Sequence, residues 1–542
     1  MLKDYIKDLI KKALGTEVDF DIFSYKERLG DYSTNIGFLI KDRSPEDMVG
    51  VFKSNPELIK IFKKIEIAGK GFINFYFSEG FLKNSLAEVL KKGVKYFKPK
   101  IKKQKINIEF VSANPTGPLT LGNGRSATYG NSLANILLFI GHKAAKEYFI
   151  NDVGNQVEKL GESIARRYLQ LKGVKVDYPE DLYQGEYITD IAREMIDKRA
   201  YHGPELEENL ELLKESARDF AIEYILREIK ETLAKFGVGF DIWFSEKKFL
   251  HDSGETQDVL NLLEFNKMSY KSEGAVWFKA TDYGLDQDVV IKKSTGQTTY
   301  LLSDFGYAQN KLKRGFNKNI YILGADHHAD VARLTAGISA LGLDEKKFVF
   351  LLHQLVALKR GPELLRMSKR KATFITLEEL MKEVGPDAIK YFFLAKSLDN
   401  HIEFDLALAK EESAKNPIFY IQYAHARIAS LIRKAKEEKI KIPKKFSKGD
   451  FNSLKHPSEF ELIKLIIKLP DLLLDVSQNY QVHHLANYAL SLARTFHGFY
   501  DNLPVLKTEE NERRARLGLV LSTGLTLKTI LNLMSISAPE SM

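Results

Sequence analysis

Apolar and polar residues repeat along this chain with two periods, and the change from one period to the other marks out its elements. Residues 2–10 carry apolar side chains at helical spacing, which predicts a first helix. In the run INFYF, residues 73–77, apolar and more polar side chains alternate, as in a strand with one buried face. The two patterns predict a small α+β domain over residues 1–100, with a lysine-rich linker at its end.

A strand, a glycine-rich loop, a helix and a second strand are predicted in succession from residue 105. Ile106, Ile108 and Phe110 share one strand face, and the helical pattern that follows the loop ends at Gly141, a residue type common just after helices. Further strand candidates lie near residues 320 and 350, with a helical stretch between them. This succession predicts a Rossmann-type domain built on a parallel sheet.

Three domains follow from these patterns. Residues 101–400 are assigned to the Rossmann-type domain, and the mixed stretch at about 155–290 reads as an insertion between two halves of its sheet. Residues 401–542 are almost wholly helical in pattern and predict a separate bundle. The predicted fold class is multi-domain α/β: a small N-terminal α+β domain, a Rossmann-type parallel-sheet domain with an insertion, and a C-terminal all-α helical bundle.

The composition narrows this picture without identifying a function. No uninterrupted apolar stretch in the 542 residues reaches the roughly 20 that a membrane span needs, so we expect no membrane segment. The absence of cysteine excludes disulfides and thiolate metal sites, and makes the cytoplasm the expected compartment. A formal net charge of +9 favours a polyanionic partner, because lysine and arginine gain from counterion release when they neutralise phosphates.

The loop NPTGPLTLGNGR, residues 114–125, is the first candidate for chemistry. Glycines let backbone N–H groups approach phosphate oxygens, and the helix that follows offers its positive N-terminal end to the same anion. Gly117, Gly122 and Gly124 suit that use. The loop can equally be a tight turn that binds no ligand, so it needs a second element to support it.

The segment LLRMSKRKATF, residues 364–374, supplies that second element. It sets Arg366, Lys369 and Arg370 beside Ser368, directly before a helical pattern. Cations near a triphosphate can hold a departing pyrophosphate and neutralise charge in the transition state. A basic tetrapeptide alone is usually just surface, but together with the glycine loop it is a more specific signal.

The two segments resemble the ATP motifs of class I aminoacyl-tRNA synthetases, and the chain is most similar to the arginyl-tRNA synthetases among them. Nearly the whole chain takes part in the resemblance, which is carried in order by GDYSTN, IAGKGFIN, IEFVSANPTGPL, YFINDVGNQVEKLG, TTYLLSDFGYA, YILGADHHADVARL, RMSKRKATFITLEELMKEVGPDAIKYFFL and NPIFYIQYAHARI. It implies an arginine–tRNA ligase, which activates L-arginine with ATP to arginyl-adenylate plus pyrophosphate and transfers arginine to the 3′-terminal adenosine of tRNA(Arg). Mg²⁺ is expected to arrive with ATP.

The chain departs from the family at the first ATP motif, where Thr120 and Asn123 stand in place of histidines. Asn123 keeps an N–H donor, whereas Thr120 offers only a shorter hydroxyl. Losing one transition-state donor costs on the order of 3 kcal/mol unless another group compensates, and we expect an active enzyme rearranged at this corner. The resemblance implies four catalytic residues: Thr120, Asn123, Lys369 and Arg366. It implies that ATP is bound by Gly117, Gly122, Gly324, Asp326, Met367 and Ser368.

Arginine recognition needs carboxylates placed for forked hydrogen bonds and suits an aromatic wall. Tyr300 and Asp304 are spaced to share one face if their segment is helical. The resemblance implies that both contact the guanidinium, that Asn114 holds the amino acid's own polar end, and that Glu109 lies close by. Tyr307 is a further candidate.

The resemblance also implies RNA contacts at both ends of the chain. In the bundle, Tyr423 and Arg427 are candidates for stacking on unpaired bases and meeting phosphates, although most aromatic residues of a bundle belong to its core. In the N-terminal domain, Tyr32 and Asn35 are candidates, and a role in a structural turn is open for both.

We expect the protein to be a monomer.

Three alternatives stay open at the level of sequence. The adjacent His327 and His328 invite a metal site, but no third ligand is apparent, so we predict no metal bound by the protein. The loss at Thr120 leaves room for a non-catalytic, synthetase-derived protein that only binds tRNA. A related ligase for another amino acid is the third possibility.

Overall fold

The structure, a computed structural model, describes residues 2–24, 30–201, 210–361, 363–365 and 375–542. The chain forms two compact units. The terminal unit consists of residues 1–102, 139–141 and 411–542, and the central unit of residues 103–138 and 142–410. Among the described residues, no helix combines the length and the apolar character needed to cross a membrane.

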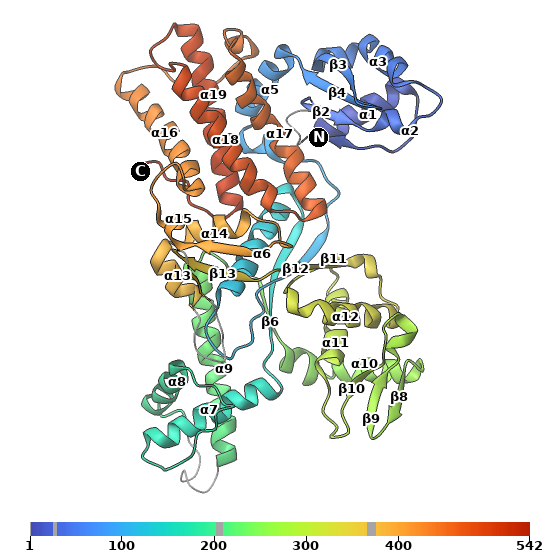
Figure 1. Cartoon of the computed structure of the whole chain (residues 1–542), viewed down its shortest axis with the longest axis vertical. Helices are drawn as coiled ribbons and strands as arrows, with labels where there is room; N and C mark the ends of the chain where they lie inside the picture. The colour runs from blue at the N-terminus through green and yellow to red at the C-terminus, as the bar shows by residue number, and fades with distance from the viewer. Residues whose placement is uncertain (1, 25–29, 202–209, 362, 366–374) are drawn as a thin grey trace. The chain divides into compact units, whose positions relative to one another are not determined.

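The N-terminal part of the terminal unit is a four-stranded antiparallel sheet with strand order β1-β2-β4-β3 and helices around it (Figure 1). In β4, Ile73, Phe75 and Phe77 are at most 1% exposed, as predicted, but Asn74 is also buried at 3%, so the predicted alternation of a buried and an exposed face is wrong at Asn74. The elements are α1 (Leu2–Leu14), β1 (Ile22–Phe23), β2 (Tyr32–Thr34), α2 (Ile36–Leu39), α3 (Pro45–Ser54), α4 (Pro56–Ile61), β3 (Phe62–Ala68), β4 (Phe72–Phe77), α5 (Glu79–Lys92) and the 3-10 turn η1 (Gly93–Phe97).

The C-terminal part of the same unit is the predicted helical bundle (Figure 1). Helix α16 begins after Asn416, whose side chain accepts a hydrogen bond from a backbone N–H of the first turn, and a proline occupies its first position. The bundle elements are α16 (Pro417–Glu437), the 3-10 turn η6 (Lys448–Phe451), α17 (Pro457–Asn479), α18 (His483–Asn502) and α19 (Glu510–Leu533).

Polar side chains join the N-terminal sheet to helix α17 within this unit. The fully buried Tyr32 donates its hydroxyl to Asp471 Oδ2 at 2.5 Å. Lys468 Nζ donates to the carbonyl of Asp31 at 2.7 Å, and Lys464 Nζ lies 3.0 Å from the Asp31 carboxylate. These buried contacts fix the N-terminal domain against the bundle.

The central unit is built on a five-stranded parallel sheet with strand order β12-β11-β5-β6-β7. The predicted Rossmann-type parallel sheet is therefore confirmed. One of its strands, β7, lies within the range 155–290 that the sequence assigns to an insertion. The strands and the helix that follows β5 are β5 (Lys105–Glu109), α6 (Leu121–Ile140), β6 (Lys143–Ile150), β7 (Ile242–Ser245), β11 (Lys318–Gly324) and β12 (Phe348–His353).

The remaining elements of the central unit flank this sheet in sequence. Between β6 and β11 the chain forms α7 (Asn155–Leu171), α8 (Glu186–Asp197), α9 (Leu210–Lys235), the π-helical turn η2 (Lys247–His251), α10 (Glu255–Phe265), β8 (Ser269–Ser272), β9 (Ala275–Phe278), the turn η3 (Ala280–Tyr283), β10 (Val289–Lys292) and α11 (Tyr300–Lys313). After β11 it forms the turn η4 (Ala325–His327), α12 (His328–Ala340), the turn η5 (Glu345–Lys347), β13 (Val356–Arg360), β14 (Glu363–Leu365), α13 (Leu377–Val384), α14 (Pro386–Leu394), β15 (Ile402–Asp405) and α15 (Leu406–Lys410).

The strand order changes direction between β5 and β11. From β5 the chain adds β6 and β7 on one side, and it later adds β11 and β12 on the other side. In open parallel sheets, ligands bind at the carboxyl ends of the strands at this kind of reversal. The loops that follow β5 and β11 are therefore the expected walls of a ligand site.

Helix α6 packs closely on the end of β5 and on α13, because its glycines remove side chains from both contacts. A Cβ atom at Gly130 would lie 2.2 Å from the Phe110 ring, and one at Gly124 would lie 2.8 Å from Leu377. Arg125, with no exposed surface, donates to the backbone carbonyls of Gln354, Ser397, Leu398 and Asn400 at 2.5–3.2 Å. Arg125 thus ties α6 to the chain after α14, a role that the sequence did not indicate.

Candidate active site

The chain leaves β5 through a strained turn. Val111 and Ser112 both have positive φ, 67° and 35°, a conformation that is rare for residues other than glycine and costly for a β-branched one. The Val111 N–H donates to Ser126 Oγ at 2.9 Å, and the Ser112 hydroxyl donates to Glu109 Oε1 at 3.2 Å. Strain held by such contacts is typical of ligand-binding loops.

Thr120 and Asn123, the two positions at which the first ATP motif was expected to depart from the family, contact each other. The backbone N–H and the hydroxyl of Thr120 both lie 2.9 Å from Asn123 Oδ1, at the residue directly before α6 and in its first turn. Because a backbone N–H can only donate, this contact identifies the oxygen of the Asn123 amide, and its NH₂ group points elsewhere. Among the described residues, that NH₂ group has no hydrogen-bond acceptor.

The chain after the predicted second ATP motif returns to the same place. Thr376 forms an isolated β-bridge with Thr120, and the Leu377 N–H donates to the Leu119 carbonyl at 2.8 Å. A capping box formed by Thr376 and Glu379 begins α13 there. The predicted residues Arg366, Met367, Ser368 and Lys369 lie outside the described residues.

The predicted ATP-binding residues lie on the loops after β5 and β11. A Cβ at Gly122 would meet only the Thr120 hydroxyl, 3.8 Å away, so the first turn of α6 is open there. A Cβ at Gly117 would lie 3.3 Å from the Tyr187 hydroxyl. Gly324 ends β11, and a Cβ there would lie 2.3 Å from the carboxylate of the exposed Asp326. The backbone is therefore open at Gly122, whereas Tyr187 and Asp326 occupy the space beside Gly117 and Gly324.

Tyr300 and Asp304 lie in the first turns of α11, which confirms that their segment is helical. Tyr300 is 51% exposed, and its hydroxyl lies 3.1 Å from the Cβ position of Gly154, whose φ of 89° also favours glycine. Asp304 is partly buried, and among the described residues its carboxylate has no hydrogen-bond or ion-pair partner. An aromatic face and an unpaired carboxylate therefore share one side of the helix.

The surroundings of Asp304 are acidic. Burial raises the pKa of its carboxyl well above the usual value, and the neighbouring carboxylates of Glu246 and Glu109 raise it further. Glu246 is buried after β7, and its Oε1 lies 3.3 Å from His251 Nε2. A site that holds one uncompensated carboxylate among others favours a cationic ligand.

The other predicted arginine contacts have partners in the protein. Glu109, 5% exposed, lies 2.6 Å from Lys311 Nζ, and Tyr307, 3% exposed, donates its hydroxyl to Glu147. Asn114 is partly exposed, and its amide donates to Gln156 at 2.7 Å. Asn114 is thus placed at the surface of the loop, whereas Tyr307 and Glu109 lie beneath it.

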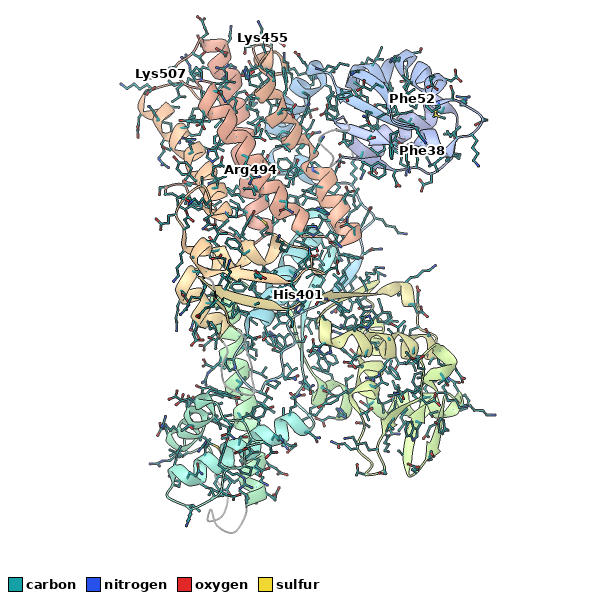
Figure 2. All side chains as sticks on the ribbon, in the orientation of Figure 1. Phe38, Phe52, His401, Lys455, Arg494 and Lys507 are labelled. Carbon is teal, nitrogen blue, oxygen red and sulfur yellow. The ribbon has the colours of Figure 1, made fainter. Side chains whose placement is uncertain are left out.

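The predicted RNA contacts in the bundle lie at a pocket, whereas those in the N-terminal domain have partners in the protein. Tyr423 is 39% exposed and, with Arg427, lines a pocket of about 500 Å³ in the bundle. The Arg427 guanidinium lies over the Tyr423 and Tyr500 rings, 5.3 and 4.5 Å from their centres. Lys507, labelled in Figure 2, belongs to the segment between α18 and α19 that also lines this pocket.

Two N-terminal candidates have structural partners instead. Tyr32 is completely buried, so its side chain offers no surface to RNA; its position before a short helix gave no sign of the contact with Asp471. Asn35 is partly exposed, and its side-chain oxygen accepts the Asp21 N–H at 2.9 Å. The turn role that the sequence left open fits Asn35, whereas Tyr32 lies on strand β2 and has no turn role.

His327 and His328 do not gather further ligands in the structure. His327 Nδ1 lies 3.2 Å from Asp330, and both side chains are exposed. Across the described ranges, no group of three or more histidine, aspartate or glutamate side chains is placed to hold a metal ion. Local sequence patterns did not indicate Arg125 and Lys311, because both bind partners that are distant in the sequence. They did not indicate Glu246 either, because it comes near Asp304 only in the folded protein.

Comparison with known proteins agrees with this arrangement. Three family descriptions match the chain: "Arginyl tRNA synthetase N terminal domain" over residues 1–77, "tRNA synthetases class I (R), catalytic domain" over 85–399, and "DALR anticodon binding domain" over 421–542. The arginine–tRNA ligase of Carboxydothermus hydrogenoformans is 42% identical, with 97% of this chain and 95% of that protein covered. That of Moorella thermoacetica is 41% identical, with 97% and 94% covered.

Solved structures show the same fold. Thermus thermophilus arginyl-tRNA synthetase superimposes with a TM-score of 0.77 at 22% identity and covers the whole of both chains. The alternative of a protein that binds tRNA without catalysis finds no support, since the Carboxydothermus and Moorella relatives are both ligases. The chain belongs to the arginyl-tRNA synthetase family, the class I aminoacyl-tRNA ligases that use ATP to join arginine to its tRNA.

Proposed function

We propose that the protein recognises arginine at the start of α11. Asp304 receives the guanidinium, Tyr300 lies against its flat face, and Asn114 holds the polar end of the amino acid. The single observation that carries this proposal is the carboxylate of Asp304, which has no partner among the described residues and is surrounded by other carboxylates. Tyr307 and Glu109 act from beneath, because their polar atoms are bound to Glu147 and Lys311.

ATP is proposed to bind between the loops after β5 and β11. The phosphates lie at the N-terminal end of α6, where the backbone is open at Gly122. The adenosine lies beside Gly324 and Asp326, at the end of β11. Gly117 keeps the loop thin, and Mg²⁺ enters with the nucleotide phosphates. The arginine carboxylate attacks the α-phosphate, and pyrophosphate leaves.

The donor to the phosphates is proposed to be the NH₂ group of Asn123. Thr120 fixes the amide oxygen with two contacts, so the NH₂ group is held in one orientation. Thr120 then acts by orienting Asn123, and Arg366, Met367, Ser368 and Lys369 are proposed to bind ATP, with Arg366 and Lys369 neutralising its phosphates. The bridge between Thr120 and Thr376 supports this, because it brings the chain back to α6 shortly after Lys369.

The tRNA is proposed to place an unpaired base in the bundle pocket lined by Tyr423 and Arg427. Four of the lining residues are cationic, Arg427, Arg433, Lys434 and Lys507, and one, Glu438, is acidic. Arg427 also pairs with Asp501, 3.1 Å away. Aromatic faces and basic groups together are suited to single-stranded bases and their phosphates. In the N-terminal domain, Asn35 lies near the exposed Phe38, labelled in Figure 2, which is a further surface for RNA.

The functional domains are proposed to be residues 1–100, which contact tRNA, 101–400, which carry out catalysis, and 401–542, which bind the anticodon. The three family matches support this division. We propose a monomer that acts in the cytoplasm, and the absence of cysteine is consistent with a reducing compartment.

Transfer of labelled arginine to tRNA(Arg) tests the recognition proposal. The unaltered protein is expected to charge tRNA(Arg) only when ATP and Mg²⁺ are present. Asp304→Asn should reduce kcat/KM for arginine by about a thousandfold, since it removes the charge that pairs with the guanidinium. Asp258→Asn, at an exposed position in the first turn of α10, is the matched control and should charge normally. Normal arginine use by Asp304→Asn would overturn the assignment.

A further inference from the structure

A buried layer of charge lies beneath the carboxyl edge of the sheet. Glu109 on β5 and Glu147 on β6 are register partners, and both are at most 5% exposed. Tyr321 on β11 is the register partner of Glu109 on the other side. The fully buried Lys311 reaches this layer from α11: its Nζ lies 2.6 Å from Glu109 Oε2, 3.9 Å from Glu147 Oε1 and 3.6 Å from the Tyr321 ring centre.

The layer is balanced by two cations. Two neighbouring buried carboxylates repel each other, and burial penalises both charges. Arg314, at the end of α11, donates to both carboxylate oxygens of Glu147, and Lys311 pairs with Glu109. Burial alone would raise the pKa of Glu147, but the hydrogen bonds from Arg314 and the charge of Lys311 bring it below its usual value. Arg314 and Lys311 therefore favour the charged form of Glu147 without help from a ligand.

Lys311 also acts on Asp304. The two residues are two helical turns apart on α11 and therefore share a face of the helix. Glu246 after β7, Glu109 on β5 and Asp330 on α12 all disfavour the charged form of Asp304, and Lys311 opposes them. Burial and these three carboxylates together raise the pKa of Asp304. Glu246 itself is contacted by His251 of η2.

We infer that Lys311 is a positioning residue of the arginine pocket. Lys311 pairs with Glu109 and approaches Glu147, and so neutralises the buried carboxylates beneath the pocket. Asp304 is then the carboxylate that receives the guanidinium. The inference rests on the proposed function, since it concerns the arginine that this site would bind. It adds a residue that does not touch the substrate and sets the pH range over which the substrate is bound.

The test is the pH dependence of KM for arginine in tRNA charging, measured from about pH 5 to about pH 8.5. Arginine keeps its side-chain charge throughout this range, so a rise in KM at low pH reports protonation of the carboxylate that binds it. In Lys311→Met the pH at which KM begins to rise is expected to move upward by about one unit, because Asp304 loses its cation. Lys311→Arg retains the charge and should keep the original profile.

Two further variants separate this role from a structural one. Lys313→Met removes a half-exposed lysine of the same helix that pairs with Glu255, and its profile should match that of the unaltered protein. Glu109→Gln combined with Lys311→Met removes both charges of the pair, so it avoids an unpaired buried carboxylate if the single variant does not fold. Its profile should return toward the original.

The outcomes are distinct. An unchanged profile in a folded, active Lys311→Met protein overturns the inference alone, as does a double variant whose profile stays where the single variant puts it. Where only the double variant folds, a return to the original profile supports the inference, and a profile displaced by a unit or more overturns it. Failure of the unaltered protein to charge tRNA with arginine would instead overturn the proposed function, and the inference with it.

Discussion

At the scale of single residues, Thr120 and Asn123 hold one amide group in a fixed orientation at the start of α6. Thr120 and Asn123 satisfy each other through one amide oxygen. The pairing uses the acceptor of Asn123 and leaves the donor for a ligand. In the proposed function, Thr120 contributes by fixing Asn123, whose NH₂ group is proposed to reach the phosphates.

This reading predicts different effects for two substitutions at Asn123 and Thr120. Asn123→Asp keeps the acceptor for the Thr120 N–H but replaces the donor with negative charge, so kcat for arginine-dependent ATP–pyrophosphate exchange with tRNA present should fall at least about a hundredfold. Thr120→Ser keeps the hydroxyl and should stay within about threefold, whereas Thr120→Val should lose about tenfold. Equal activity of Thr120→Val and Thr120→Ser would contradict the orienting role.

At the scale of elements, the site depends on how closely α6 approaches β5. Gly130 has no room for a side chain, since a Cβ would lie 2.2 Å from the Phe110 ring. The same approach sets where the helix begins, and therefore where Asn123 lies relative to the turn at Val111. Packing and catalytic geometry are thus linked through one helix.

Gly130→Ala should therefore destabilise the protein. Because the clash involves a buried ring attached to the sheet, the expected cost is about 2–4 kcal/mol, measured as a lower unfolding midpoint in urea. Gly50→Ala is the matched control: Gly50 also lies inside a helix, but a Cβ there would meet nothing within 4 Å. That control should be neutral or stabilising, by up to about 1 kcal/mol. An unchanged midpoint for Gly130→Ala would show that α6 can move away.

Local periodicity was enough to predict the elements that carry the site. The strands ending at Glu109 and Gly324, the helix of α6 and the helical face shared by Tyr300 and Asp304 were all expected from residue spacing or from the family resemblance. The buried partners were not, because Lys311 and Glu109 are far apart in sequence and meet only when α11 packs on the sheet. Tyr32 likewise reads as a polar turn residue until helix α17 covers it.

At the scale of the whole molecule, the terminal unit joins the two ends of the chain through buried polar groups. Asp471 is 1% exposed, and its carboxyl accepts a hydrogen bond from the Tyr32 hydroxyl. Burial raises the pKa of Asp471 to about 6. The folded state therefore holds a proton on this carboxyl at pH values where the unfolded chain, with its usual pKa near 4, has already released it.

The titration of Asp471 makes the stability of the fold depend on pH. Between about pH 4 and pH 6 the folded protein binds more protons at Asp471 than the unfolded chain, so the contribution of this group becomes less favourable as pH rises, by on the order of 3 kcal/mol in all. Asp471→Asn keeps an acceptor for Tyr32 and removes the titration. The free energy of unfolding of Asp471→Asn minus that of the unaltered protein should increase from about pH 4 to about pH 7. A difference independent of pH would refute the assignment.

The bundle pocket makes a separate prediction for tRNA. Arg427→Gln removes the cation that lies over Tyr423 and Tyr500, so KM for tRNA(Arg) should rise by about tenfold, and the salt dependence of binding should weaken. KM for arginine at saturating tRNA should not change. Arg514→Gln, which affects a partly exposed arginine paired with Asp450 elsewhere in the bundle, should leave both values unaltered. Equal effects of the two substitutions would place the RNA elsewhere.

The central claim is that the charge of Asp304 selects arginine, and its most direct test is discrimination between arginine and citrulline, which carries a neutral urea group in place of the guanidinium. The ratio of kcat/KM values for the two substrates in tRNA charging should exceed about a thousand in the unaltered protein. In Asp304→Asn the ratio should fall below about ten. A ratio that stays above a thousand in Asp304→Asn would show that another group recognises the guanidinium.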